Sequence, residues 1–166
     1  MKVDLIQIQR LGEQKFEENH RFRTFLKSRS HNDKRLRVIA EQVQEQIDCT
    51  ECANCCRKAT AVVSDRDVQR LAKYFRITPA QFIKEYTVNS EEEGRVLRKT
   101  ENGCVFLEGN LCSIYDVRPH VCEGYPHTVR GSGSIASRMW QFVDRASYCP
   151  IVYHTMEAWK VETRFR

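Results

Sequence analysis

The stretch DCTECANCCRK, residues 48–58, places four cysteines within eight positions, and Cys55 and Cys56 are neighbours in the chain. The whole spacing is C-x2-C-x2-C-C, then C-x7-C-x9-C, and finally C-P. Chance clustering of a rare residue explains this pattern poorly. We therefore predict that all eight cysteines are metal ligands: Cys49, Cys52, Cys55, Cys56, Cys104, Cys112, Cys122 and Cys149.

The composition favours metal ligation over disulfide formation. The chain has 166 residues, of which 41% are hydrophobic, enough for one domain with a real core. Its first twenty residues break every apolar run, and no stretch approaches the roughly 20 apolar residues of a membrane span. We expect a cytoplasmic protein without a membrane segment. Thiols stay reduced in that compartment, so an even cysteine count indicates metal binding before disulfides.

Helical periodicity covers most of the chain outside the cysteine-rich part. Residues 1–47 read as two helices with Asn32 as a cap between them, and Ser64 with Asp67 reads as a capping box. Thr78, Pro79 and Gln81 begin another helix. After the GSGS linker at 131–134, one helix carries the apolar stripe from Ile135 to Ala146, and Pro150 opens a last one.

Residues 95–115 change to a strand pattern, and we predict a three-stranded antiparallel meander there, with no internal repeat in the chain. If residues 108–110 form a three-residue loop, Cys112 faces the same side as Cys104, as shared ligation would require. A two-residue loop would separate the two sulfurs. Asn54, in the cysteine loop, tolerates the left-handed conformation that such a loop needs.

The spacing favours an iron–sulfur cluster, with zinc as the alternative. Three cysteines at successive C-x2-C steps and a distant C-P cysteine are similar to ferredoxin-type ligation. Structural zinc more often uses two separated C-x2-C pairs. Adjacent Cys55 and Cys56 cannot easily bind one metal together. Either the eight thiols divide into two sites, or one site is accompanied by structural or redox-active thiols.

Charge gives a further expectation. Four thiolates around one zinc ion, or around an oxidised four-iron cluster, leave a net charge of about −2, so nearby cations are expected. Arg57, Lys58 and Arg118 are candidates. His120, His127 and His154 lie near cysteines in the sequence, and with eight thiols present we assign them supporting or surface roles.

These motifs together resemble the YkgJ-like cysteine-cluster family, whose members are described as zinc- or iron-chelating proteins. The resemblance rests on CTECANCCR, on CVFLEGNLCSIYDVRPHVCEGYP and on the late CP dipeptide, and it spans residues 49 to about 150. It implies a metal-binding cysteine cluster that uses all eight cysteines. A similar module occurs in flagellin lysine methylases, where an iron–sulfur cluster is implicated, which implies iron and a role in protein modification.

A basic segment precedes the cysteines. Residues 20–37 carry seven Lys or Arg residues against Asp33, a net charge of +6, whereas the whole chain carries +5. This segment could bind nucleic acid or an acidic protein. No RNA-binding sheet motif or helix-turn-helix pattern accompanies it, which favours a solvated helix face over a nucleic-acid surface.

We therefore predict a mainly helical (α+β) domain with a short antiparallel meander, held together by a cysteine-ligated metal centre. Residues 1–48 form basic N-terminal helices and residues 49–166 the metal-binding part, together as one compact unit. The expected cofactor is a 4Fe-4S cluster, in a protein with a redox role or one in modifying an unknown partner protein. The alternative is a non-catalytic zinc-binding module that binds a protein or nucleic acid through its basic helices.

Overall fold

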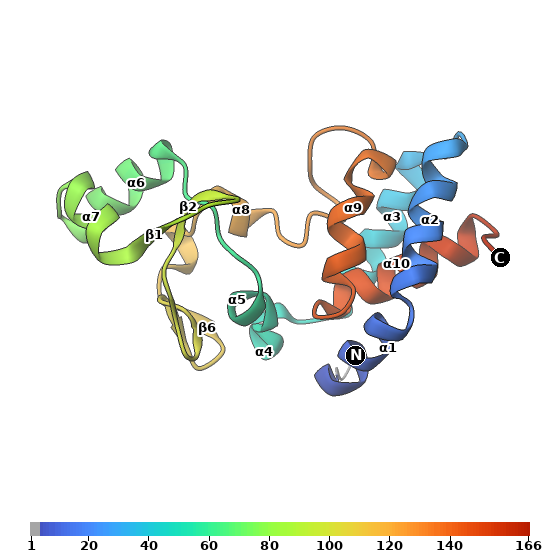
Figure 1. The fold of residues 1–166 in the computed structure, drawn as a ribbon, viewed down its shortest axis with the longest axis horizontal. Coiled ribbons are helices and arrows are strands. Elements are labelled where there is room, and N and C mark those ends of the chain that lie inside the picture. The colour runs from blue at the N-terminus through green and yellow to red at the C-terminus, as the bar shows by residue number, and fades with distance from the viewer. Residues whose placement is uncertain (1–3) are drawn as a thin grey trace. The chain divides into compact units, whose positions relative to one another are not determined.

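The computed structural model describes residues 4–166 and is mainly helical, with short antiparallel two-stranded sheets (Figure 1). Residues up to Cys49 and from Pro126 onward form one compact unit, called unit 1, and Thr50–Tyr125 form the other, unit 2. The C-terminal helices thus share a unit with the N-terminal helices, a grouping that the sequence alone did not suggest. None of the helices in residues 4–166 has the length and apolar character needed to cross a membrane.

Unit 1 is a helical bundle. Its helices are α1 (Leu5–Gln14), α2 (Phe16–Ser28), α3 (Asp33–Gln44), α9 (Ile135–Arg145) and α10 (Pro150–Glu162). Helix α2 packs on α9 and α3 packs on α10, and Figure 1 shows these four helices side by side. The prediction of two helices before residue 47 was wrong in number, because the chain breaks between α1 and α2 at Lys15. The predicted start of this region, residues 1–3, lies outside the described residues.

The core of unit 1 is built around α9 and α10, as their apolar stripes predicted. Met139, Phe142 and Trp159 are completely buried. Trp159 Nε1 donates a 2.7 Å hydrogen bond to the carbonyl oxygen of Leu36, which joins α10 to α3. Burial of such large side chains stabilises the bundle more than helix propensity does.

Caps begin these helices where the sequence placed them. The Asn32 side chain accepts a hydrogen bond from the Arg35 amide at the start of α3, so the predicted cap is confirmed. Cys149 is the N-cap residue of α10, and Pro150 occupies the first helical position. The proline matches the rules for helix starts, whereas the Cys149 side chain makes no capping hydrogen bond.

A buried ammonium group adds a polar contact to this bundle. The side chain of Lys160 is only 7% exposed, and its Nζ pairs with Glu18 Oε1 at 2.5 Å and with Glu157 Oε1 at 2.7 Å. Glu157 also pairs with Lys15. Burying an unpaired charge is costly, and these carboxylates offset that cost for the Lys160 ammonium group inside unit 1. The pair with Glu18 also connects α10 to α2.

Unit 2 combines short helices with three hairpins. Its helical segments are α4 (Cys49–Cys52, beginning at the last residue of unit 1), α5 (Asn54–Lys58), α6 (Asp65–Phe75), α7 (Pro79–Tyr86), the 3-10 turn η1 (Tyr115–Val117) and α8 (His120–Glu123). The hairpins pair β1 (Thr87–Ser90) with β2 (Gly94–Leu97), β3 (Lys99–Thr100) with β4 (Gly103–Cys104), and β5 (Leu107–Glu108) with β6 (Leu111–Cys112). The predicted capping box at Ser64 is confirmed, and the helix start predicted at Thr78 is also found, with a second capping box.

The single three-stranded meander was wrong. Turns interrupt the chain after every two residues from Lys99 onward, and the strands pair two by two, β3 with β4 and β5 with β6. Segments 99–106 and 107–114 repeat the same order of two strand residues, a turn, two strand residues and a turn. The repeat places Cys104 and Cys112 at the same position of consecutive hairpins, opposite Lys99 and Leu107. The recurrence is one of local structure, because the two segments share only an asparagine and a cysteine at matching positions.

The hairpins rest on a small aromatic core. Phe75, Tyr86 and Phe106 lie nearly parallel to one another, with ring centroids 5.1–5.6 Å apart. Phe106 and Ile114, which follow the two hairpin cysteines by two residues, are both buried. The cysteine-bearing hairpins are thus anchored by apolar packing.

One glycine lets the second hairpin approach the cysteine loop. Gly103 has φ +122°, and a Cβ atom there would lie 2.8 Å from the carbonyl oxygen of Cys56 and 3.0 Å from Arg57 Cα. Only a residue without a side chain fits this backbone contact. Within the loop itself, Ala53 takes the left-handed conformation at φ 47°, and Asn54 already begins α5, so the expected role of Asn54 was wrong.

A buried carboxylate joins α6 to α8. Asp67 Oδ2 accepts from the Ser64 amide at 3.1 Å and hydroxyl at 2.6 Å, and its Oδ1 accepts from Arg70 Nη2 at 2.9 Å and from the His120 amide at 3.1 Å. Burial opposes the charge of Asp67, but these hydrogen bonds outweigh it and hold the pKa of Asp67 below its ordinary value. The capping residue of α6 thereby also fixes the start of α8, which carries Cys122.

The close contact at Gly103 predicts a large loss of stability for Gly103→Ala. The variant combines overpacking with an unfavourable φ, so we expect the free energy of unfolding to fall by about 2–4 kcal/mol. Gly109→Ala is the matched control, because Gly109 also has positive φ (+62°) but has no atom within 4 Å of its Cβ position. Its cost should be about 1 kcal/mol. Urea denaturation of both variants measures the difference, and equal losses would contradict the close contact.

The hydrogen bonds of Asp67 predict that Asp67→Asn lowers the stability of the protein by an amount that depends on pH. We expect the variant to be less stable by about 1.5–3 kcal/mol at pH 7, because Asn cannot accept the hydrogen bonds made by both carboxylate oxygens. The pKa of Asp67 is lowered in the fold, so its contribution is present above the unfolded pKa of about 4 and is lost as the pH falls through the folded pKa. The difference in free energy of unfolding between the unchanged protein and Asp67→Asn should therefore become smaller as the pH falls below about 4.

Asp65→Asn serves as the control for this comparison. The Asp65 side chain is 92% exposed and pairs with Arg95 Nη1 at 2.7 Å. An exposed ion pair of this kind contributes about 0–1 kcal/mol. Thermal or urea unfolding between pH 3 and 7 should separate the two variants, and a gap for Asp67→Asn that stays constant down to pH 3 would refute the assignment.

Candidate metal centre

Four thiols of unit 2, on α5, β4, β6 and α8, interact electrostatically with one another. They belong to Cys56, Cys104, Cys112 and Cys122. Each thiol of this set lies near enough to the other three for the two charges to interact. We call these four residues the unit 2 thiol set. Its members are separated by as many as 66 positions in the sequence, and the hairpin repeat with α8 brings them together.

Backbone amides prepare two of these sulfurs for the thiolate form. The Phe106 amide donates a hydrogen bond to the Cys104 sulfur, and the Ile114 amide donates one to the Cys112 sulfur. In both cases the donor lies two residues after the cysteine, in the turn that closes one unit of the repeat. Such amide-to-sulfur bonds stabilise thiolate ligands and tune metal sites.

The sequence analysis compared a two-residue with a three-residue loop near residues 108–110 and assumed one continuous sheet. That assumption was wrong. The β5–β6 loop contains two residues, Gly109 and Asn110, because Leu107 pairs with Cys112 and Glu108 with Leu111. In one continuous sheet this loop would have separated the Cys104 and Cys112 sulfurs. The two cysteines instead belong to consecutive hairpins, and the turn at residues 105–106 redirects the chain between them. Cys104 and Cys112 therefore approach one another without a three-residue loop.

Burial opposes the thiolate form in three of the four thiols of the set. Burial raises the pKa of Cys122 to about 12, and the charges of the three other thiols of the set add to this effect. Burial also raises the pKa of Cys104 and of Cys112, against the hydrogen bonds from the amides. The hydrogen bond from Cys55 lowers the pKa of Cys56 to about 7, helped by Arg57 and Arg118 and opposed by burial. A metal bound here would therefore displace protons.

The predicted cations take different positions. Arg57 donates to the carbonyl oxygens of Cys52 at 3.1 Å and Gly109 at 2.9 Å, and to Asn110 Oδ1 at 2.7 Å. It thereby fastens the cysteine loop to the tip of the β5–β6 hairpin, and Asn110 Nδ2 adds a 3.0 Å bond to the Glu51 carbonyl oxygen. The Arg118 guanidinium lies over the Tyr115 ring, 3.8 Å from its centroid.

The other predicted ligands lie outside the unit 2 thiol set. Cys55 Sγ is 4.0 Å from Cys56 Sγ, and Cys52 ends α4 in unit 2. Cys49 is exposed at the end of unit 1, and Cys149 is buried there as the cap of α10. His120 is 89% exposed at its side chain, in keeping with the predicted surface role.

The donor set fits a metal that prefers sulfur, because thiolates are the ligands of both zinc and iron–sulfur sites. As placed, no three histidine, cysteine, aspartate or glutamate side chains in residues 4–166 form a group that could hold an ion. Metal binding would have to draw the thiols closer together. The sequence showed the cysteines, but it did not show the roles of the Phe106 and Ile114 amides or of the Asp67 carboxylate. The available signal for the two amides was a repeated pattern, in which a cysteine is followed two residues later by a large apolar residue.

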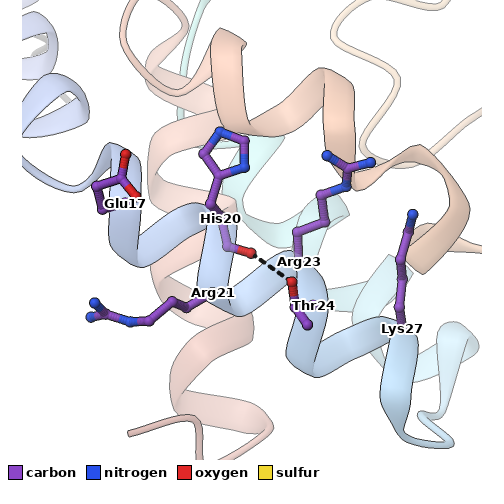
Figure 2. Close-up of a pocket in the computed structure, with 6 residues that line it drawn as sticks. All are labelled: Glu17, His20, Arg21, Arg23, Thr24 and Lys27. Atoms are coloured by element: carbon purple, nitrogen blue, oxygen red, sulfur yellow. Dashed lines mark hydrogen bonds between the residues drawn. The ribbon is translucent and has the colours of Figure 1, made fainter.

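A second candidate surface lies on α2, in unit 1. Figure 2 shows a shallow hollow lined by Glu17, His20, Arg21, Arg23, Thr24 and Lys27, with a volume of about 350 Å³. Within the described part of the chain, Arg21, Arg23 and Lys27 form no ion pair with a carboxylate. The α2 part of the predicted basic segment therefore carries charge that no carboxylate neutralises, whereas Arg35 on α3 pairs with Glu162.

Comparison with known proteins agrees with the thiol pattern. Residues 48–150 match the model of the CxxCxxCC family, described as "Putative zinc- or iron-chelating domain". An uncharacterized protein of Methanocaldococcus jannaschii is 30% identical over 84 residues, which are 49% of this chain and 45% of that protein. The matched segment thus spans less than half of this relative. No solved structure is significantly similar to the chain.

The family match covers more than half of the chain and includes all eight cysteines. It also contains every residue that positions the unit 2 thiol set. The protein therefore belongs to the CxxCxxCC family of zinc- or iron-chelating cysteine-cluster domains.

Proposed function

We propose that the unit 2 thiol set, Cys56, Cys104, Cys112 and Cys122, binds one metal centre. The observation that supports this proposal is the electrostatic interaction among the four thiols, combined with an amide donor at Cys104 and another at Cys112. Four sulfur ligands satisfy a tetrahedral zinc ion or a four-iron cluster equally. For Cys49, Cys52, Cys55 and Cys149, metal ligation is proposed from their spacing in the sequence alone.

We infer further that the protein carries a 4Fe-4S cluster and serves electron transfer or the modification of a partner protein. The ferredoxin-type spacing of its cysteines supports iron over zinc. When bound, such a cluster supplies one-electron redox chemistry. The chain itself contributes thiolates, amide hydrogen bonds to sulfur, and the buried side chains of Phe106 and Ile114, which keep water from one side of the thiol set.

Anaerobic metal analysis tests this proposal. We expect the purified protein to be brown, to contain iron and acid-labile sulfide, and to lose its visible absorption on reduction. Cys104→Ser and Cys122→Ser should each lose most of the metal, because each removes one ligand of a four-ligand centre.

Leu111→Ser is the matched control for these variants. Leu111 is adjacent to Cys112, and its side chain is 62% exposed, so the variant introduces serine without removing a sulfur. It should keep the metal content of the unchanged protein. Colourless protein with stoichiometric zinc would refute the iron–sulfur assignment but not the metal centre. Full metal content in both cysteine variants would refute the unit 2 thiol set.

A second candidate function is supported by the hollow on α2. In this alternative we infer that zinc binding only holds the protein together, and that Arg21, Arg23 and Lys27 bind an acidic protein or nucleic acid. Three cations without carboxylate partners attract such a surface without first breaking internal ion pairs.

Heparin chromatography at increasing salt tests the alternative. Neutralising the three α2 cations with glutamine should lower the salt concentration at which the protein elutes, because fewer counterions are released on binding. Glutamine at Arg66, Lys73 and Lys84, three exposed cations of unit 2, changes the net charge equally and serves as the control. Equal shifts in the two triple variants would show that net charge alone, and not the α2 surface, determines retention.

A further inference from the structure

We propose that Arg138 of α9 is the centre of an oxyanion site in unit 1, which binds a phosphate group through the guanidinium edge formed by Nε and Nη2. This inference does not depend on the metal centre, because every residue it uses belongs to unit 1. Arg138 is only 7% exposed. Within residues 4–166 it forms no ion pair with a carboxylate. A guanidinium buried in this way is destabilising unless an anion accompanies it.

Two of the three guanidinium nitrogens of Arg138 have no hydrogen-bond partner. Nη1 donates to the carbonyl oxygen of His127 and, at 2.9 Å, to that of Arg130. Nε and Nη2 are buried and unpartnered within the described part of the chain. These two nitrogens form one edge, which fits two oxygen atoms of a phosphate or carboxylate group. Thr128 is completely buried between the two residues that accept from Nη1, and its Oγ1 is also unpartnered there.

Arg35, on α3, shows how the same edge is used when an anion is present. Its Nε lies 3.1 Å from Glu162 Oε1, and its Nη2 lies 3.5 Å from Glu162 Oε2. The Arg35 side chain is 53% exposed, so water can hydrate it without this pair. The more buried guanidinium of Arg138 thus lacks the partner that the exposed one has.

A glycine-rich loop, residues 130–134, covers Arg138. All five of its residues are exposed, and a Cβ atom at Gly131 would overlap Nη1 of Arg138 and lie 3.0 Å from its Cζ. Gly131 and Gly133 both have positive φ, +146° and +76°, and Ser134 then caps α9. Glycine-rich loops that lead into a helix N-terminus recur at phosphate sites. One layer of main chain therefore lies between the guanidinium and solvent, and displacement of this loop would open the site.

The surroundings of Arg138 favour an anion with more than one negative charge. Arg37 Nη2 donates a 3.3 Å hydrogen bond to the carbonyl oxygen of Gly133, in the covering loop. Burial, and after it the charge of Arg37, lower the pKa of Arg138, whereas Asp33 raises it. Asp33 Oδ2 accepts a 3.1 Å bond from the Ile135 amide at the start of α9. Two guanidinium groups and the positive end of the α9 dipole exceed this one carboxylate, which favours phosphate over a monovalent carboxylate.

Tryptophan fluorescence during thermal unfolding tests the site. Trp140 and Trp159 are the two tryptophans of the chain and both lie in unit 1, so their emission reports the unfolding of that unit. Inorganic phosphate is added to the reduced full-length protein, with sodium chloride at equal ionic strength as the reference. At a phosphate concentration tenfold above the dissociation constant, the melting temperature should rise by about 3–6 °C. Sodium acetate at the same ionic strength should give a smaller rise.

Variants of Arg138 connect this rise to the proposed edge. Arg138→Gln should abolish the rise, because it removes both the charge and the edge. Arg138→Lys retains the charge but has no pair of coplanar donors, so it should keep less than half of the rise. Arg35→Gln is the matched control, because it removes an equal charge from an exposed position of unit 1, and it should show the full rise.

Four outcomes of these melting experiments would overturn the inference. They are an unchanged melting temperature in phosphate, a full rise in Arg138→Gln, a full rise in Arg138→Lys, and an equal rise with acetate. The triple glutamine variant at Arg21, Arg23 and Lys27 should retain the rise. Its loss there would place the phosphate on α2 and would also overturn the inference.

A measurement on the unchanged protein covers the case in which Arg138→Gln does not fold. In ¹⁵N-labelled protein, the Nε–H resonance of Arg138 should shift on addition of phosphate, and by more than that of Arg35, whose edge is already occupied by Glu162. Equal shifts at the two residues, or no shift at Arg138, would show that phosphate does not reach the guanidinium. The unpartnered nitrogens would then be served by trapped water, and the oxyanion site would be refuted.

Discussion

The arrangement of unit 2 depends on the backbone contact between Gly103 and the carbonyl of Cys56. That contact places β4 directly against α5, and it is possible only because residue 103 has no side chain. Cys104 follows Gly103 in the chain, so the approach that seats the hairpin also brings Cys104 to Cys56. Lys99 Nζ reinforces it with a 2.9 Å hydrogen bond to the Lys58 carbonyl oxygen. The position of the thiols is therefore a property of the main chain more than of the cysteine side chains.

Local signals in the sequence predicted the helices well. The caps at Asn32, Ser64 and Thr78 depend on hydrogen bonds within a few residues, which a sequence displays directly. Pro150 starts α10 because its fixed φ suits the first helical position and its missing N–H is not needed there. The break at Lys15 has no such signal. The pairing of α10 with α3 could not be predicted either, because it depends on contacts such as Trp159 with Leu36, over 100 residues apart.

The candidate site shows the same division between local and distant information. The spacing of the cysteines was sufficient to predict metal ligation and the family. It could not show which thiols approach one another, because this depends on Gly103 and on the eight-residue repeat, whose two copies share few identical residues. Nor could it show that Asp67, a capping residue by its sequence, also holds the start of α8 through the His120 amide.

The bonds made by Arg57 affect how freely this region can change during evolution. Two of its three acceptors are main-chain carbonyl oxygens, at Cys52 and Gly109, and Asn110 similarly reaches the main chain at Glu51. Main-chain oxygens are present whatever side chain a position carries. Substitutions at Glu51 can therefore accumulate without loosening the loop, and selection for its attachment to the hairpin falls mainly on Arg57 and Asn110.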